Sequence, residues 1–227
     1  MNTFHENVRI AVSQSQDGTM KKTGHTNPAS VDENRRSFLN RHHISMEQTV
    51  LVQLDYGTAD FCLYKTVKGK DGGDGIVREP SITSDALVTQ TAGLALFLPI
   101  ADCVGAVLYD PTTNTLMVSH LGRHNIEQDG GQKSVKYLVQ NHTVNPRDVL
   151  VWLSPSAGKE NYPLFAFDNH SLQEVVIEQL ENAGIIAHNI SRSDIDTTRD
   201  VNYFSHSEFQ KGHRSKDGRF AIVAMLK

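Results

Sequence analysis

The chain has little cysteine and no long apolar run. Only Cys62 and Cys103 occur among its 227 residues. We expect two unpaired thiols in a cytoplasmic protein, although two cysteines could also form one disulfide. No stretch of 18 consecutive apolar residues is present, so no transmembrane helix and no membrane partner are predicted. Residues 1–8 include His5 and Glu6 and lack an apolar core, which argues against a signal peptide.

A surplus of positive charge is also lacking. The formal net charge is −4 and the isoelectric point is about 6.2, so the overall charge does not indicate a nucleic-acid partner. Hydrophobic residues make up 38% and charged residues 21%, which is typical of a globular protein and not of a disordered one. The length and the absence of repeats favour one domain over residues 1–227.

Several common catalytic signatures are missing. The sequence contains no CxxC, no HExxH and no GxSxG segment. It also has no HxH pair, and His42-His43 is its only pair of adjacent histidines. Multicopper oxidation needs about ten histidine and cysteine ligands, so a true laccase site is not supported.

The hydrophobic pattern predicts a mixed α/β (α+β) fold. Helices are predicted at 30–43, with Ser30 as N-cap and Glu33 completing a capping box, and at 132–140 and 171–183. Strands are predicted at residues 8–13, 50–54, 61–67, 84–89, 94–100, 104–109, 116–120, 149–153, 185–190 and 220–226. Strands and helices do not alternate strictly, which favours mixed sheets over a doubly wound parallel sheet.

The most informative residues are Cys103 and His120. Asp102 and Cys103 follow a segment predicted as a buried strand, and His120 ends a later strand. Two strand ends can bring a thiol and an imidazole to the same edge of a sheet. Such a pair can form a thiolate nucleophile, or both side chains can bind zinc or copper. A buried cysteine is, however, most often a small core residue.

Ten short motifs in register resemble the YfiH/laccase-domain family (DUF152). They are SQSQDG (13–18), ENRR (33–36), LDYG (54–57), SDALVT (84–89), ADC (101–103), YDP (109–111), HLGRHN (120–125), SPSAGKENY (154–162), FSHS (204–207) and DGRFAIVAML (217–226). The corresponding family motifs include Q-V-H-G, A-D-C, H-A-G-W-R-G and F-S-Y-R. Their order and spacing extend along nearly the whole chain.

The resemblance implies a four-layer α/β/β/α sandwich, similar to that of bacterial toxin deamidases with a Cys–His dyad. It also implies a pocket formed by two histidines and a cysteine. Family members are described as zinc-binding purine nucleoside phosphorylases with adenosine deaminase side activity, and earlier as copper-dependent polyphenol oxidases. The implied partners are therefore a purine nucleoside and phosphate, and zinc is a more plausible cofactor than copper.

This chain departs from the family pattern at several positions. Cys103 and His120 are kept, whereas Tyr56 stands where the family has its first metal histidine. The implied metal set is thus Cys103, His120 and Tyr56, and the site could be metal-free because a phenol is a poor zinc ligand. Arginines of the family are replaced by Ser15 and by residues of the HLGRHN and FSHS segments, which weakens the case for phosphorolysis.

The resemblance also suggests substrate-binding residues. Arg35 in the N-R motif, Asp102 in A-D-C and His124 are the candidates. His124, like His206, could alternatively replace the missing metal histidine. For Arg35, an ordinary place on the helix surface is an equally good interpretation.

The sequence leaves three functions open. The first is a purine nucleoside enzyme that uses Cys103 and His120, with or without zinc, for phosphorolysis or deamination. The second is a hydrolase or amidase in which Cys103 is the nucleophile and His120 the base. The third is a catalytically inactive member of the family with a binding role.

Overall fold

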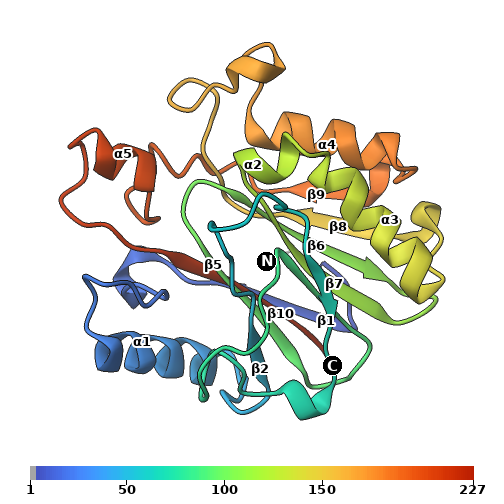
Figure 1. Cartoon of the computed structure of the whole chain (residues 1–227), viewed down its shortest axis with the longest axis horizontal. Coiled ribbons are helices and arrows are strands. Elements are labelled where there is room, and N and C mark those ends of the chain that lie inside the picture. The colour runs from blue at the N-terminus through green and yellow to red at the C-terminus, as the bar shows by residue number, and fades with distance from the viewer. Residues whose placement is uncertain (1–3) are drawn as a thin grey trace.

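The computed structural model describes residues 4–227 and contains two sheets (Figure 1). The first has the strand order β1-β10-β5-β2, and the second has the order β3-β4-β7-β6-β8-β9. The strands of the first sheet are β1 (Val8–Val12), β10 (Phe220–Leu226), β5 (Ala95–Ile100) and β2 (Thr49–Leu51). Those of the second are β3 (Tyr64–Thr66), β4 (Ala86–Thr89), β7 (Thr115–Leu121), β6 (Val104–Asp110), β8 (Leu150–Leu153) and β9 (Ile190–Arg192). Both sheets contain parallel and antiparallel pairs, so the prediction of mixed sheets is confirmed.

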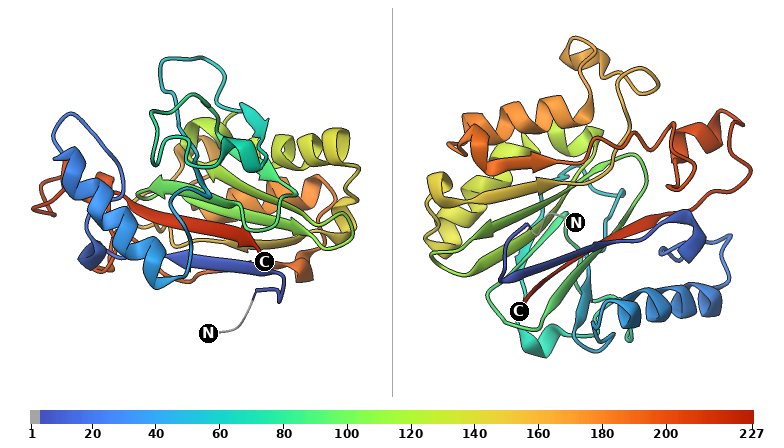
Figure 2. Two further views of the ribbon diagram at one scale, coloured as in Figure 1. Left: turned by 90° about the horizontal axis from the view of Figure 1, so that it is seen from below. Right: turned by 180° about the vertical axis from the view of Figure 1, so that it is seen from behind.

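Three apolar cores separate four layers. One core lies between the two sheets and includes Leu98 and Ile222 from the first and Val107 from the second. Another packs the second sheet against α3 (Gly130–His142) and α4 (Leu172–Asn182). The third packs the first sheet against α1 (Pro28–Arg41). Figures 1 and 2 show α1 on one outer side and α3 and α4 on the other, which is the expected α/β/β/α sandwich.

The central strands follow directly from their composition. Every residue of β5, β6, β7 and β10 is buried, because both faces of these strands are covered. The predicted strand at 220–226 is confirmed residue for residue. The helix α4 also begins as predicted: the Ser171 hydroxyl accepts a hydrogen bond from the Glu174 amide, and the Ser171 amide donates one to the Glu174 carboxylate.

Two predictions about single elements are wrong. The first helix begins at Pro28 and not at Ser30, because Asn27 accepts a hydrogen bond from the Ala29 amide and Pro28 suits the first helical position. The predicted strand at 185–190 is instead a 3₁₀ turn, Ala187–Asn189, followed by the short strand β9. The apolar run at residues 185–190 is too short to distinguish a strand from a turn that packs on the core.

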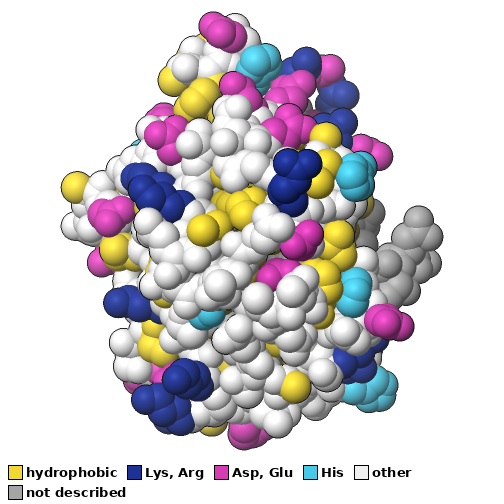
Figure 3. Space-filling model, turned by 90° about the vertical axis from the view of Figure 1, so that its right-hand side faces the viewer, with side chains coloured by type: hydrophobic (Ala, Val, Ile, Leu, Met, Phe, Trp, Pro, Cys, Tyr) yellow, Lys and Arg dark blue, Asp and Glu magenta, His cyan; other side chains and the backbone are white. Residues whose placement is uncertain are grey.

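Two short helices were not predicted from the sequence. These are α2 (Arg123–Ile126) and α5 (His206–Gln210), each of about one turn. Among residues 4–227, no helix is both long and apolar enough to cross a membrane. On the face shown in Figure 3, lysine and arginine side chains are interspersed with acidic ones, so this face carries no continuous basic stripe.

Candidate active site

The register of β6 and β7 brings Cys103 and His120 to the same face of the second sheet. Gly105 lies opposite His120, and Val104 lies opposite Leu121. Directly opposed residues of an antiparallel pair point to the same face, and side chains alternate along each strand. Cys103 directly precedes β6 and therefore lies at the strand end beside His120.

Gly122 shows how close the two reactive groups are. A Cβ atom added to this glycine would lie 2.8 Å from the Cys103 Sγ, 3.1 Å from the His120 Cε1 and 3.2 Å from the His120 Nε2. The φ of Gly122 is −93°, so its backbone would accept any residue. Glycine is required here because a side chain would occupy the space that the thiol and the imidazole share.

A strained turn fixes the cysteine. Asp102 has φ +71° and is 4% exposed, a conformation that costs energy in a residue other than glycine. Its carboxylate accepts hydrogen bonds from the Thr197 hydroxyl (3.0 Å) and the Ser207 amide (2.7 Å), and its carbonyl accepts one from the Ala157 amide (2.8 Å). Three distant segments thus hold the turn that presents Cys103.

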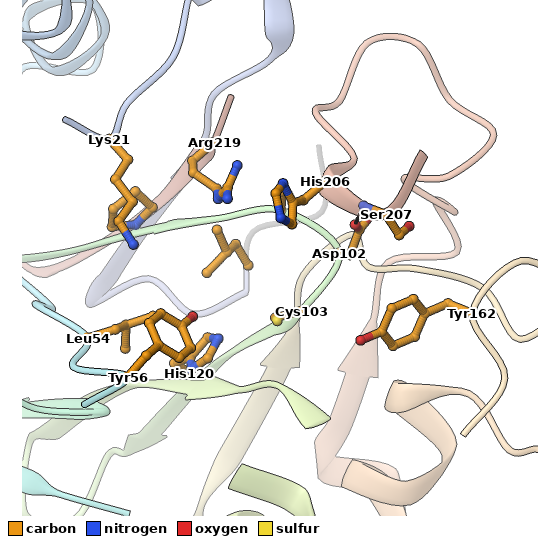
Figure 4. A pocket seen from close by; sticks show the side chains of 13 residues that line it. Lys21, Leu54, Tyr56, Asp102, Cys103, His120, Tyr162, His206, Ser207 and Arg219 are labelled. Atoms are coloured by element: carbon orange, nitrogen blue, oxygen red, sulfur yellow. Dashed lines mark hydrogen bonds between the residues drawn. The ribbon is translucent and has the colours of Figure 1, made fainter. Parts of the chain in front are cut away.

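Cys103, His120 and Asp102 line a cavity of about 200 Å³. In Figure 4, Lys21 and Arg219 approach from one side, and Tyr56 and His120 lie on the other. The remaining labelled side chains around the cavity are Leu54, Asp102, Cys103, Tyr162, His206 and Ser207. Lys21, Tyr162 and Arg219 were not among the residues selected from the sequence, because their positions depend on loops that the local pattern does not place.

The electrostatics keep both reactive groups neutral. Burial, followed by the nearby Asp102 carboxylate, raises the pKa of the Cys103 thiol to about 12, although Arg219 and Lys21 oppose this. Burial lowers the pKa of His120 to about 3, and the Lys21 charge adds to the effect. The His120 Nδ1 is buried and has no hydrogen-bond partner within the described chain. The pair is therefore a neutral thiol beside a neutral imidazole and not a preformed thiolate.

The set Cys103, His120 and Tyr56 does not fit a tightly held zinc ion. Zinc sites use three or four histidine, cysteine or carboxylate ligands, and residues 4–227 contain no group of three such side chains close enough to hold a metal. Desolvation of its hydroxyl, followed by the nearby Cys103, raises the pKa of Tyr56 to about 12, which disfavours a phenolate ligand. Zinc binding by Cys103, His120 and Tyr56 stays a prediction, and the poor ligand properties of the Tyr56 phenol argue against it.

Arg35 does not line this cavity. It is 2% exposed, and its guanidinium donates hydrogen bonds to the carbonyl oxygens of Met20 (2.8 Å) and Gly75 (3.0 Å). Burial lowers its pKa to about 10. Arg35 thus joins the loops of Met20 and Gly75 through two hydrogen bonds. It is neither exposed on the helix surface nor part of the Cys103 cavity.

His124 also lies outside the cavity lining. Its ring stacks on Phe61 with centroids 4.8 Å apart, and its Nδ1 lies 3.6 Å from the Glu127 carboxylate. His206 does line the cavity, and its Nδ1 lies 3.1 Å from the Asp217 carboxylate. Asp102 lies at the cavity wall, but each of its carboxylate oxygens already accepts a hydrogen bond, one from Thr197 and one from Ser207.

A comparison of sequences assigns the family. Residues 10–170 match the model of the family described as "Multi-copper polyphenol oxidoreductase laccase". The chain belongs to this laccase-domain family. A curated relative, "Purine nucleoside phosphorylase" from Xylella fastidiosa (strain Temecula1 / ATCC 700964), is 27% identical over 175 residues. That match covers 66% of this chain and 64% of the relative, just under two thirds of the relative's length.

Solved structures of laccase-domain relatives share the fold. YlmD from Geobacillus stearothermophilus superposes with a TM-score of 0.85 at 20% identity, covering 98% of this chain and 93% of that one. YfiH from Bacillus licheniformis gives 0.82 at 22% identity, with 97% and 93% covered. NMB0706 from Neisseria meningitidis, a DUF152 protein, gives 0.77 at 15% identity, with 98% and 96% covered. At these identities the structures support the fold alone.

Proposed function

We propose that this laccase-domain protein cleaves purine nucleosides by phosphorolysis. The observation that carries the proposal is the presence of the Cys103–His120 pair and two cations, Lys21 and Arg219, in one cavity. Phosphate is attracted by such cations, and the curated relative's name indicates this reaction class.

The surroundings also suit a nucleoside. A second cavity of about 400 Å³ shares Tyr162 with the first, and Leu164, Phe165 and Phe167 lie along it. Aromatic and apolar side chains of this kind are typical of the walls around a flat base. The ribose would then lie near Tyr162, between the base and the cations.

In the proposed reaction a phosphate oxygen bonds to C1′ of the ribose while the bond from C1′ to the purine nitrogen breaks. The electron pair of that bond leaves with the purine, which takes up the proton that the hydrogen phosphate loses. Lys21 and Arg219 hold the phosphate. The neutral Cys103 thiol and the Tyr162 hydroxyl, whose pKa values are both raised, keep their protons for hydrogen bonding to the substrate.

A hydrolase with Cys103 as nucleophile is less well supported. The thiolate is the nucleophilic form, and catalytic cysteines usually have pKa values well below 8.5. At Cys103 the pKa is raised to about 12 and the adjacent imidazole is neutral. Deamination of adenosine at the same cavity would need water and no phosphate, so the presence or absence of phosphate separates the two reactions.

The test is chromatography of inosine and adenosine incubated with the purified protein, with and without phosphate. We expect phosphate-dependent release of hypoxanthine or adenine, with a loss of at least about 100-fold in Cys103→Ala. Cys62→Ala is the matched control and should retain activity, because Cys62 does not line the cavity. Phosphate-independent formation of inosine from adenosine would instead assign a deaminase. No conversion would overturn the proposal and favour a binding role.

A further inference from the structure

Lys21 and Lys22 are adjacent lysines with different surroundings. The Lys22 ammonium lies 2.8 Å from the Asp32 carboxylate. Lys21 has no hydrogen bond or ion pair with any residue from 4 to 227, although its side chain lines the Cys103 cavity. The Lys21 ammonium is therefore free to donate hydrogen bonds to an anion bound in the cavity.

The groups around Lys21 do not neutralise it. Burial and the nearby Arg219 guanidinium lower the pKa of Lys21, in that order, and only weaker contributions from Cys103 and Asp217 oppose them. Cys103 is a neutral thiol at physiological pH, and the Asp217 carboxylate already binds Arg219 (2.7 Å) and His206 (3.1 Å). On this side of the cavity the Lys21 ammonium has no carboxylate partner within residues 4–227, whereas the Arg219 guanidinium is paired through its Nη1 with Asp217.

The Lys21 ammonium lies beside the ring of Tyr56. The Lys21 Nζ stands 5.7 Å from the centre of the Tyr56 ring, within the range of a cation–π contact. Figure 4 shows the Lys21 ammonium pointing across the cavity toward Tyr56, which lies beside His120. Tyr56 is also the residue that stands at the position of the family's metal histidine. A positive charge from Lys21 is therefore present at the place where the chain lacks a metal ligand.

We propose that Lys21, together with Arg219, forms an oxyanion subsite that binds phosphate without a divalent metal ion. The proposal deepens the phosphorylase function and rests on it for the choice of phosphate as ligand. Lys21 supplies one compact charge and Arg219 a planar group with several donors, a combination suited to a tetrahedral oxyanion. The segment that carries Lys21 is fixed by the hydrogen bond from Arg35 to the Met20 carbonyl.

The experiment measures the affinity of the full chain for inorganic phosphate by calorimetry or ³¹P NMR after treatment with a chelator. We expect the chelated wild type to bind phosphate. Lys21→Met should weaken binding about tenfold or more, since it removes a charge-assisted contact. Lys22→Met should stay within about twofold of wild type, because Asp32 neutralises Lys22. Phosphate binding that requires added zinc, or that is unchanged in Lys21→Met, would overturn the subsite.

A second measurement needs no variant. Acylation of the wild-type lysines is followed by mass spectrometry with and without phosphate. Phosphate should protect Lys21 and leave Lys22 unprotected, and equal protection of both residues would argue against the subsite. This readout keeps the proposal testable if Lys21→Met does not fold.

The two proposals fail in distinguishable ways. Phosphate binding that depends on Lys21 without cleavage of any nucleoside leaves the subsite standing and removes the phosphorylase. Nucleoside cleavage with unaltered phosphate affinity in Lys21→Met would support the phosphorylase function and overturn the Lys21 subsite. If phosphate and adenosine bind together, free phosphate is the ligand. If adenosine 5′-phosphate displaces phosphate through Lys21, the subsite serves the phosphoryl group of a nucleotide.

Discussion

The two sides of the Cys103 pocket are built differently. On one side Cys103, His120 and Gly122 lie at strand ends, and the register of β6 and β7 fixes their relative positions. On the other side Lys21 and Arg219 lie outside the strands, on segments that are joined by a hydrogen bond from the Met20 amide to the Arg219 carbonyl and fixed by the side chain of Arg35. The strand side is therefore determined by many backbone contacts, whereas the loop side depends on single residues.

The loop side should be the easier one to break. We expect Arg35→Met to lower the free energy of unfolding by about 2–3 kcal/mol, because two carbonyls lose a buried charged donor. Urea unfolding measures the effect. Phosphate affinity should fall as well, since the Met20 carbonyl anchors the segment that carries Lys21.

The neighbouring arginine is the matched control for this prediction. Arg36 is exposed and lies 3.6 Å from Glu33, so Arg36→Met should change stability by less than about 0.5 kcal/mol. Equal effects of the two substitutions would show that Arg35 is not the brace of the loop side.

The strand side should respond to added volume. Gly122→Ala places a methyl group 2.8 Å from the Cys103 Sγ, and we expect it to cost about 1–3 kcal/mol of stability and most of the turnover. Thermal unfolding and the nucleoside assay measure the two effects. Gly24→Ala is the control, because no atom lies within 4 Å of the added carbon there. Retained turnover in Gly122→Ala would mean that the reaction does not use the space between the Cys103 thiol and the His120 imidazole.

The smallest expected effect concerns acid. Because the pKa of His120 is about 3 in the folded protein and about 6.5 in an unfolded chain, the unfolded state binds more protons between these values. The contribution of His120 to stability is therefore present above about pH 6.5 and decreases as the pH falls toward 3. Between pH 6.5 and 5, wild type should lose about 1–2 kcal/mol more than His120→Gln in urea unfolding. Identical pH profiles would show that His120 is not buried in its neutral form.

The sequence pattern predicts the strand side better than the loop side. The strands around Cys103 and His120 were predictable because a buried strand is a continuous apolar run, and strand ends meet at a sheet edge. The exact limits of β10 also follow from local sequence. The four layers came from the family resemblance and not from periodicity.

The loop side depends on contacts between residues far apart in the sequence. Lys21 and Arg219 were missed because their segments join the pocket through tertiary hydrogen bonds. The position of Arg35 could not be read from the N-R motif, because nothing in a helix pattern shows that a charged residue will be buried against two carbonyls. The error at residues 185–190 has the opposite cause, since a short apolar run is compatible with both a strand and a turn.

The strand β10 has a consequence for how the protein is made. It lies between β1 and β5, and Val8 pairs with Leu226, so the first sheet cannot close until residues 220–226 have been synthesised. During translation β1 and β5 carry unpaired edges and exposed apolar faces, which are sites of aggregation. The Asp102 carboxylate likewise lacks its hydrogen-bond donors until Thr197 and Ser207 have been synthesised. A ribosome-bound chain that ends before residue 197 would thus lack both the closed sheet and the turn that presents Cys103, and chaperones would be expected to bind it.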